Sequence, residues 1–379
     1  MTPRTMNIYS ATLLSLVVRV AMITGLLSLA ACGGGDSGAP PAQAALFSKL
    51  GFPSGFASSQ ASAISADGFV VAGTATTVDG KSEAFRWSAK DGMSEIGYLP
   101  GGVRSMASGV SADGSVIVGS GDTTSAPVTP VSGFRWMLST GVVRIDPIPG
   151  SYLCSPSGVS GDGATVSGTC LTTNSEGFRW THGTGSIGLG RFGGGSDATS
   201  SATAVSSDGA VIVGAGHPLL TGAVAWPLAE KVLVIGKLPG AASASALAVS
   251  RDGSVVVGAS MDNAQVAQAF RWERQAGIVP LATMAAGIQG SVAAAISGDG
   301  TIIAGWAITG TGEAAFIWDA ERGMRLLEAV LAVDYQTEIA GWKLTRATAI
   351  SDDGRTIAGY GTNPQGQVEA WIAKLPQAY

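Results

Sequence analysis

Seven aspartates in the repeated pattern Ser-x-Asp-Gly are the residues of this sequence that most resemble a chemical site. Carboxylates bind divalent cations and act as acids and bases, so a convergent group of them would form a metal or catalytic centre. These aspartates recur only once every 44 to 54 residues, which places them on seven separate units. Asp and Gly are also preferred turn residues, so we interpret the pattern as a structural turn. Its serines are Ser65, Ser111, Ser160, Ser206, Ser250, Ser297 and Ser351.

An arginine in a second repeated block, Phe-Arg-Trp, is the next candidate, and Ala225 and Ile317 replace it in two copies. Equivalent positions on separate units cannot converge on one ligand. We therefore predict that each arginine bonds to backbone or carboxylate between neighbouring units, or extends along their surface. The arginines are Arg86, Arg135, Arg179 and Arg271.

The histidines and the Gly-rich segments do not predict a cofactor site. The chain has two histidines, and His182 and His217 follow different strands of their units, which predicts opposite rims. A histidine metal site or a triad with a histidine base is therefore not expected. The segment GRFGGGSD from 190 lacks the helix start and the Lys of a phosphate loop. We predict no catalytic residue, no metal site and no cofactor.

Two cysteines, Cys154 and Cys170, lie at nearly equal distances from the turn formed by residues 160–163. Residues placed in this way face each other across a hairpin. We predict a disulfide between them, which an exported protein can retain. Two buried free thiols are the alternative.

Each unit is predicted to contain four strands. A β-branched residue precedes Ser-x-Asp-Gly and a Val/Ile segment follows it, as in AISADGFVVAG from 63, which indicates strand, turn and strand. The Phe and Trp of the second block are two residues apart, so they share one face of a third strand. A Gly-containing turn and a short apolar stretch, such as EIGYLPGG from 95, indicate a fourth. The closing Gly of the first block, such as Gly73, is expected either where another backbone approaches closely or at the end of a strand.

Seven four-stranded antiparallel units of about 47 residues predict an all-β fold, a seven-bladed β-propeller over residues 46–376. The seventh unit ends at AWIAKLP, 370–376, without a fourth strand, whereas LFSKLGFPSG from 46 resembles that strand in other units. We therefore predict that residues 46 to 52 supply the outer strand of the last blade. The insertion at 324–342 is expected to form a short helix.

The order of these features resembles the WD-repeat blade, with its Asp-Gly turn, its third-strand Trp and its borrowed closing strand. More closely, the seven copies over about 46–375 resemble the HAF family of probable extracellular repeat proteins. The resemblance implies a propeller fold and an exported location. It implies no activity and no functional residues.

Residues 1–31 have the features of a bacterial export signal. They contain basic but no acidic residues, and the apolar run from Val20 to Ala31 is too short to span a membrane. The segment ends in Leu-Ala-Ala-Cys32-Gly33, which resembles the lipobox in which the Cys is lipidated. An ordinary secretory signal is the alternative. Residues 32–45 are rich in Gly and Pro and are interpreted as a flexible tether.

The expected partner of this N-terminus is a membrane. Gly33 follows Cys32 where an Asp would favour inner-membrane retention, so we expect an outer-membrane or cell-surface location. The net charge of −5 makes nucleic acid an unsuitable partner. We expect a monomer.

Because the repeated residues are explained by the fold, function is expected in the unrepeated loops. The favoured hypothesis is a lipid-anchored binding or scaffold module at the cell envelope, without enzymatic activity, that binds a protein or glycan on the rim of the propeller. The alternative is an exported hydrolase or lyase that acts on glycans or peptides at the axial opening. A purely structural envelope protein is a third possibility. The candidate rim residues are Arg104, Asp122, Asp197, His217, Asp262 and Asn363.

Overall fold

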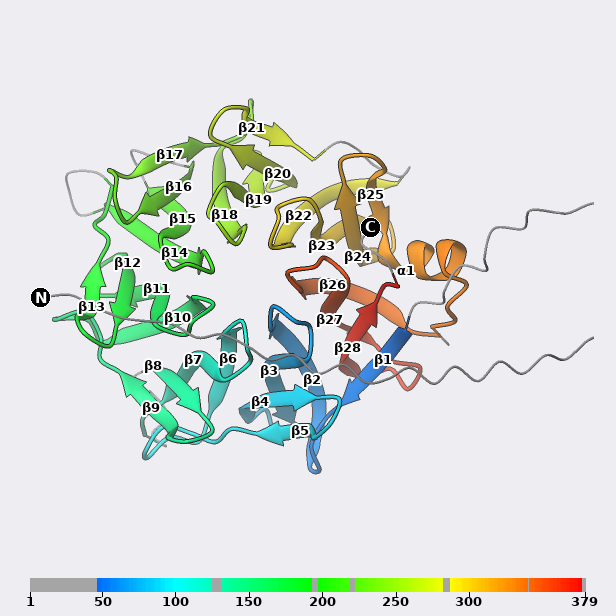
Figure 1. Ribbon diagram of the computed structural model, residues 1–379, viewed down its shortest axis with the longest axis horizontal. Coiled ribbons are helices and arrows are strands. Elements are labelled where there is room, and N and C mark those ends of the chain that lie inside the picture. The colour runs from blue at the N-terminus through cyan, green and yellow to red at the C-terminus, as the bar shows by residue number, and fades with distance from the viewer. Residues whose placement is uncertain are drawn as a thin grey trace, which may run out of the picture. The chain divides into compact units, whose positions relative to one another are not determined.

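A computed structural model describes residues 46–124, 131–192, 197–217, 222–281, 287–339 and 341–376. In these ranges the strands form seven separate four-stranded sheets. Every pair of neighbouring strands within a sheet is antiparallel, and the sheets stand as blades in a ring around a common axis (Figure 1). The predicted all-β, seven-bladed propeller is confirmed.

Each blade uses its four strands in the same order from the axis outwards. The innermost strands are β2 (Phe56–Ile64), β6 (Ser105–Val110), β10 (Leu153–Val159), β14 (Thr199–Val205), β18 (Ser243–Val249), β22 (Ile288–Ile296) and β26 (Lys343–Ile350), in blades 1 to 7. The second strands are β3 (Val70–Thr77), β7 (Val116–Asp122), β11 (Thr165–Leu171), β15 (Val211–His217), β19 (Val255–Met261), β23 (Ile303–Thr309) and β27 (Thr356–Thr362).

The two outer positions follow the same scheme. The third strands are β4 (Ser82–Ser88), β8 (Val131–Met137), β12 (Ser175–Thr181), β16 (Gly222–Pro227), β20 (Ala267–Glu273), β24 (Gly312–Asp319) and β28 (Val368–Lys374). The fourth strands are β5 (Gly92–Glu95), β9 (Gly141–Ile145), β13 (Gly185–Gly188), β17 (Leu233–Gly236), β21 (Gly277–Pro280), β25 (Gly323–Leu326) and, in blade 7, β1 (Leu46–Gly51). The propeller has a turn face, with the turns between first and second and between third and fourth strands, and a linker face at the other strand ends.

The Ser-x-Asp-Gly turns join first and second strands, as the sequence predicts. In blade 2 the Ser111 hydroxyl donates to the Asp113 carboxylate at 2.7 Å and accepts the backbone N–H of Val116 at 2.9 Å. The same pair of bonds occurs in all seven blades. Every one of these serines is at most 1% exposed, so both bonds lie in the interior. The aspartates are therefore acceptors within their own turns.

The glycine of each turn packs closely against a side chain of the preceding blade. Gly114 has φ +70°, and a Cβ built there would lie 2.4 Å from Val70 in blade 1. Closing glycines such as Gly73 also mark close approach, since a Cβ there would lie 2.2 Å from the Gln60 carbonyl of the first strand. The largest fully buried side chains include the third-strand rings Phe85 and Phe134, which pack where the blades diverge.

The N-terminal strand closes the ring, as predicted. β1 pairs antiparallel with β28, and Leu46 lies opposite Lys374 (Figure 1). Phe47 packs against Trp342 and Trp371 of blade 7, with ring centroids 5.4 and 6.3 Å away. The buried carboxylate of Glu369 accepts the backbone N–H of Gly51 at 3.0 Å. The two ends of the propeller therefore stabilise each other.

The insertion before blade 7 contains the expected short helix. It comprises α1 (Leu327–Ala329) and a π-helical turn, η1 (Val330–Asp334). Leu327, Val330 and Leu331 are buried against the core of blade 7. Within the described ranges, no helix combines the length and apolar character needed to cross a membrane.

Candidate functional site

The axial end of the turn face is built by the second residue of each Ser-x-Asp-Gly turn. Its backbone N–H donates to the carbonyl of the equivalent residue in the next blade, at 2.8 to 3.1 Å, and Asp352 closes the cycle by donating to Ala66. Seven backbone hydrogen bonds thus form a closed ring. The residues of the ring are Ala66, Ala112, Gly161, Ser207, Arg251, Gly298 and Asp352.

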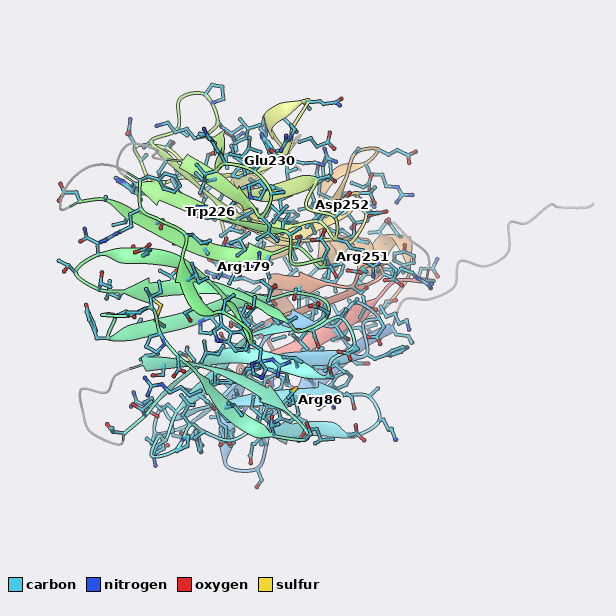
Figure 2. The ribbon with its side chains drawn as sticks, turned by 60° about the vertical axis from the view of Figure 1, so that its left-hand side comes forward. Arg86, Arg179, Trp226, Glu230, Arg251 and Asp252 are labelled. Carbon is cyan, nitrogen blue, oxygen red and sulfur yellow. A yellow bond between two sulfur atoms is a disulfide. The ribbon has the colours of Figure 1, made fainter. Side chains whose placement is uncertain are left out.

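A cavity of about 140 Å³ opens at this ring, and Arg251 and Asp352 supply the two charges among its lining residues. The Arg251 guanidinium meets the Asp352 carboxylate at 2.7 Å. The pair joins blade 5 to blade 7 past Gly298 of blade 6, where a Cβ would lie 2.9 Å from the Asp352 carboxyl carbon. Glycine at this position therefore gives the Asp352 side chain its space. Figure 2 labels Arg251 at this end of the propeller.

Asp352 differs electrostatically from the turn aspartates. Burial raises the pKa of the Asp352 carboxyl, and the neighbouring charges of Asp353 and Asp299 raise it further, while Arg251 opposes them. Hydrogen bonding to Ser111 lowers the pKa of Asp113, and hydrogen bonding to Ser160 similarly lowers that of Asp162. The axial end thus holds a cation beside a carboxyl that accepts a proton more readily than usual.

Three of the four arginines in the arginine column bridge neighbouring blades, as predicted. Arg135, Arg179 and Arg271 donate to the carbonyl of the turn glycine in the next blade, at 3.2, 2.9 and 3.4 Å. Arg86 instead meets Asp91 of its own blade at 3.7 Å. Ala225 leaves blade 4 without this bridge, and a pocket of about 440 Å³ lies between blades 4 and 5 at this place.

Two of the six predicted rim residues are buried within the linker face. Asp122 accepts the backbone N–H groups of Val103 and Arg104 at 2.7 and 2.9 Å, which fastens the linker between blades 1 and 2. Asn363 donates to Glu369 at 2.7 Å and caps the turn after β27. Both side chains are at most 5% exposed, so they hold loops in place.

The other four rim residues are exposed on the linker face but belong to different blades or linkers. Arg104 precedes blade 2, Asp197 precedes blade 4, His217 ends β15 and Asp262 follows β19. The Asp262 carboxylate caps its own loop by accepting the N–H groups of Ala264 and Val266. The structure therefore does not gather the six residues into one site.

The remaining predicted residues are also located. His182 is exposed in the turn after β12, on the turn face, whereas His217 lies on the linker face. Cys154 and Cys170 lie opposite each other on β10 and β11 and are joined in a disulfide with Cα atoms 4.0 Å apart. No group of three or more His, Cys, Asp or Glu side chains suited to a metal occurs among the described residues. Cys32 lies outside them.

Sequence reasoning missed Arg251 and Asp352. A signal for them exists: the second position of the seven turns holds Ala, Ala, Gly, Ser, Arg, Gly and Asp, so these two are the charged members of a column of small residues. The six rim residues are polar residues of the loops, whereas Arg251 and Asp352 occupy a variable position inside the repeat itself.

Comparison with solved structures finds propellers at low sequence identity. An oligogalacturonate lyase from Vibrio parahaemolyticus is 11% identical, with 90% of this chain and 100% of that chain covered and a TM-score of 0.57. A prolyl endopeptidase is 12% identical, with 88% and 50% covered and a TM-score of 0.52. TolB from Acinetobacter baumannii is 13% identical, with 68% and 63% covered and a TM-score of 0.48, so the chain spans less than two thirds of TolB. No protein-family model and no curated protein matches the sequence.

The prediction that this chain lacks enzymatic activity is corrected by these neighbours. It rested on a propeller whose inner strands carry mostly small residues, yet propellers of this architecture include a lyase and an endopeptidase. The architecture therefore gives no ground for excluding an enzyme. At 11 and 12% identity the likeness to the lyase and the endopeptidase establishes the β-propeller fold and its repeated blades.

Proposed function

We propose that this chain is an exported propeller of the cell envelope that binds a glycan or peptide at the axial opening of its turn face. The Arg251–Asp352 pair supports the proposal, because it is the charged feature at the point where all seven blades meet. Its side chains are 60% and 31% exposed, so a ligand can reach both. An arginine can bind carboxylates in a bidentate manner, and an aspartate can accept from hydroxyl or amide donors.

Binding at the axial opening is tested with an array of envelope glycans and peptides. We expect the double variant Arg251→Ala/Asp352→Ala to bind its ligand at least about tenfold more weakly than the parent, because charge-assisted hydrogen bonds are lost. Arg104→Ala and His217→Ala on the linker face are the matched controls. If the double variant retained ligand binding while Arg104→Ala and His217→Ala lost it, the binding site would lie on the linker face.

A second candidate function is hydrolysis or elimination of the bound glycan or peptide. The raised pKa of Asp352 favours it, since a carboxyl shifted upwards by burial can act as a general acid or base nearer neutral pH. Arg251 could stabilise negative charge that develops on the substrate. In this proposal Asp352 exchanges the proton and Arg251 orients the substrate.

Turnover is tested by incubating the parent and Asp352→Asn with the ligands found in the binding experiment. New reducing ends or amines would report hydrolysis, and ultraviolet absorbance of a new double bond would report elimination. Once the ligand is bound, we expect the variant to turn it over about 10²- to 10⁴-fold more slowly than the parent, the usual contribution of a general acid or base. Equal rates for parent and variant would contradict a catalytic role for Asp352.

The location is proposed from the N-terminal sequence. The segment Leu-Ala-Ala-Cys32-Gly33 supports export and lipidation at Cys32, with Gly33 favouring the outer membrane or cell surface. The Gly- and Pro-rich stretch to residue 45 would then separate the propeller from the bilayer. The resemblance to HAF repeat proteins supports the exported location. We propose that the anchored protein is a monomer.

A further inference from the structure

The pocket between blades 4 and 5 lies where the arginine column is interrupted. Ala225 pairs with Val213 on the neighbouring strand, as Arg135 pairs with Val118 and Arg271 with Val257. The register therefore places Ala225 at the position of those arginines. The pocket of about 440 Å³ is lined by Ala225 and by the turn glycine of the next blade, Gly253. The equivalent pocket between blades 5 and 6, where Arg271 is present, is smaller, at about 340 Å³.

The other gaps show which chemical group this space accepts. Between blades 3 and 4, the Arg179 guanidinium donates to the Gly209 carbonyl at 2.9 Å and to the Thr165 hydroxyl at 3.2 Å. Between blades 5 and 6, Arg271 reaches the equivalent Gly300 carbonyl. Among the described residues, no donor bonds to the Gly253 carbonyl, and the same holds for the turn glycines Gly68, Gly114 and Gly354, whose gaps also lack an arginine bridge. An acceptor that other blades satisfy with a guanidinium is thus left open to a ligand.

The walls of the pocket suit a long cationic side chain. Val211, Leu233 and the largely buried Trp272 supply apolar surface for an aliphatic stem. The charged lining consists of Glu230, Asp252 and Glu273 against one basic residue, Arg274. Glu273 already pairs with Arg271 at 2.5 Å. Among the described ion pairs Asp252 has no cationic partner, and this remaining negative charge favours a cation over a phosphate or carboxylate. Figure 2 labels Glu230 on blade 4 and Asp252 on the turn of blade 5.

We propose that this pocket binds the guanidinium of an arginine side chain in a peptide or protein partner. The guanidinium donates to the Gly253 carbonyl and to Glu230 at the mouth, in the manner of the internal arginines of the neighbouring gaps. Arg274, which now pairs with Glu230 at 2.9 Å, competes for the same carboxylate. Both side chains of that pair are more than half exposed, so a ligand can displace Arg274 at little energetic cost.

Two matched peptides test the chemistry on the purified chain. Calorimetric titration with acetyl-Gly-Arg-Gly-amide and with its citrulline counterpart compares side chains of nearly equal shape, of which only arginine is charged. We expect the arginine peptide to bind at least about tenfold more tightly, because charge-assisted hydrogen bonds distinguish the two. Equal binding of both peptides, or no detectable binding of either at millimolar concentration, would overturn the proposal.

Variants test the position. Ala225→Arg should fill the pocket from within, raise the melting temperature and abolish binding of the arginine peptide, while ligand binding at the axial opening stays unchanged. Arg274→Ala should strengthen peptide binding by freeing Glu230. If Ala225→Arg does not fold, Glu230→Gln provides the test, with a weakening of at least about threefold expected for an exposed charged contact. Retained binding in a folded Ala225→Arg protein would contradict this site.

A reciprocal variant tests whether the missing arginine makes the pocket. Arg179→Ala removes the internal guanidinium from the gap between blades 3 and 4 and leaves the Gly209 carbonyl open. We expect this variant to lose thermal stability and to recover part of it in millimolar guanidinium or arginine amide, beyond any effect on the parent. Lack of selective recovery would show that these gaps do not accept a free guanidinium group.

Discussion

At the scale of single residues, the turn serines are buried and form two hydrogen bonds each in the interior, whereas the aspartates beside them accept bonds at the surface of the turn. The buried Ser111 hydroxyl accepts the N–H of Val116 and also donates to Asp113, whose carboxylate accepts the N–H of Ser115. Leaving a buried donor without a partner costs about 1–3 kcal/mol. The repeat therefore preserves a small hydrogen-bonded unit, and its carboxylate is already engaged as an acceptor.

The lowered pKa of the turn aspartates predicts how stability responds to acid. Hydrogen bonding to Ser111 and to residue 115 holds the pKa of Asp113 below its ordinary value of 3.8. A carboxyl with a lowered folded-state pKa stabilises the protein above its unfolded-state value, and this stabilisation is lost as pH falls through the folded-state value. Asp113→Asn should thus be less stable than the parent at pH 6, and the difference should shrink below about pH 4.

Chemical denaturation of both proteins between pH 2 and 7 measures this difference. Lys90→Gln is the control, because Lys90 is exposed and carries no carboxyl group. Its stability difference from the parent should stay constant over the acid range. A difference for Asp113→Asn that is independent of pH would contradict the stabilising role given to the carboxylate.

At the scale of elements, the closing strand joins the two ends of the ring. β1 contributes the buried Leu50 to the core between the last and first blades, and the ring of Phe47 packs against the core between blades 6 and 7. The Ser59 hydroxyl of blade 1 also donates to the Gly51 carbonyl at 2.6 Å and accepts the Ala370 N–H of β28 at 3.0 Å. One short strand therefore completes the sheet of the last blade and also bonds to the first blade.

Deletion of residues 46–51 should lower the melting temperature by at least about 10 °C, because large buried side chains each contribute about 2–5 kcal/mol. Differential scanning calorimetry measures the change. Deletion of an equal number of residues from the Gly- and Pro-rich stretch before Ala45 is the control and should leave the melting temperature unchanged. If the two deletions melted alike, closure by β1 would not stabilise the ring.

At the scale of the whole molecule, the blades are coupled in two concentric ways. The cycle of backbone bonds between the turns, such as Ala66 N–H to Ala112 at 3.0 Å, links the blades at the axis. The arginine bridges and the turn glycines link them further out, with Gly163 packed against Val116 of the preceding blade. A ring held in this way tolerates replacement of its surface residues, which is consistent with low identity between propellers of similar fold.

The proposed anchor is tested on the intact precursor expressed in a bacterial host. Cys32→Ala should move the mature protein from the detergent phase to the aqueous phase in a detergent phase separation, because a lipidated Cys is the proposed membrane attachment. Cys154→Ala is the control, since that residue lies within the propeller. An unchanged distribution for Cys32→Ala would contradict lipidation at this residue.

The number of blades, the turn chemistry and the closing strand were predictable from the sequence because each depends on local patterns. A Ser-x-Asp-Gly turn forms from bonds within about five residues, and the missing fourth strand after residue 376 is visible as a gap in the repeat. The bridges from Arg135, Arg179 and Arg271 were also predictable, because equivalent arginines can bond to a backbone partner that recurs from blade to blade.

Only the tertiary structure decided which of the variable residues meet. Arg251 and Asp352 are far apart in the sequence, and they form a pair because closure brings blades 5 and 7 around the axis with only Gly298 between them. In the sequence, Ala225 is one of many small residues. It lines a pocket because the folded ring places Gly253 of the next blade on the other side of the gap. Periodicity describes what the units share, whereas a site depends on long-range contacts between the positions at which they differ.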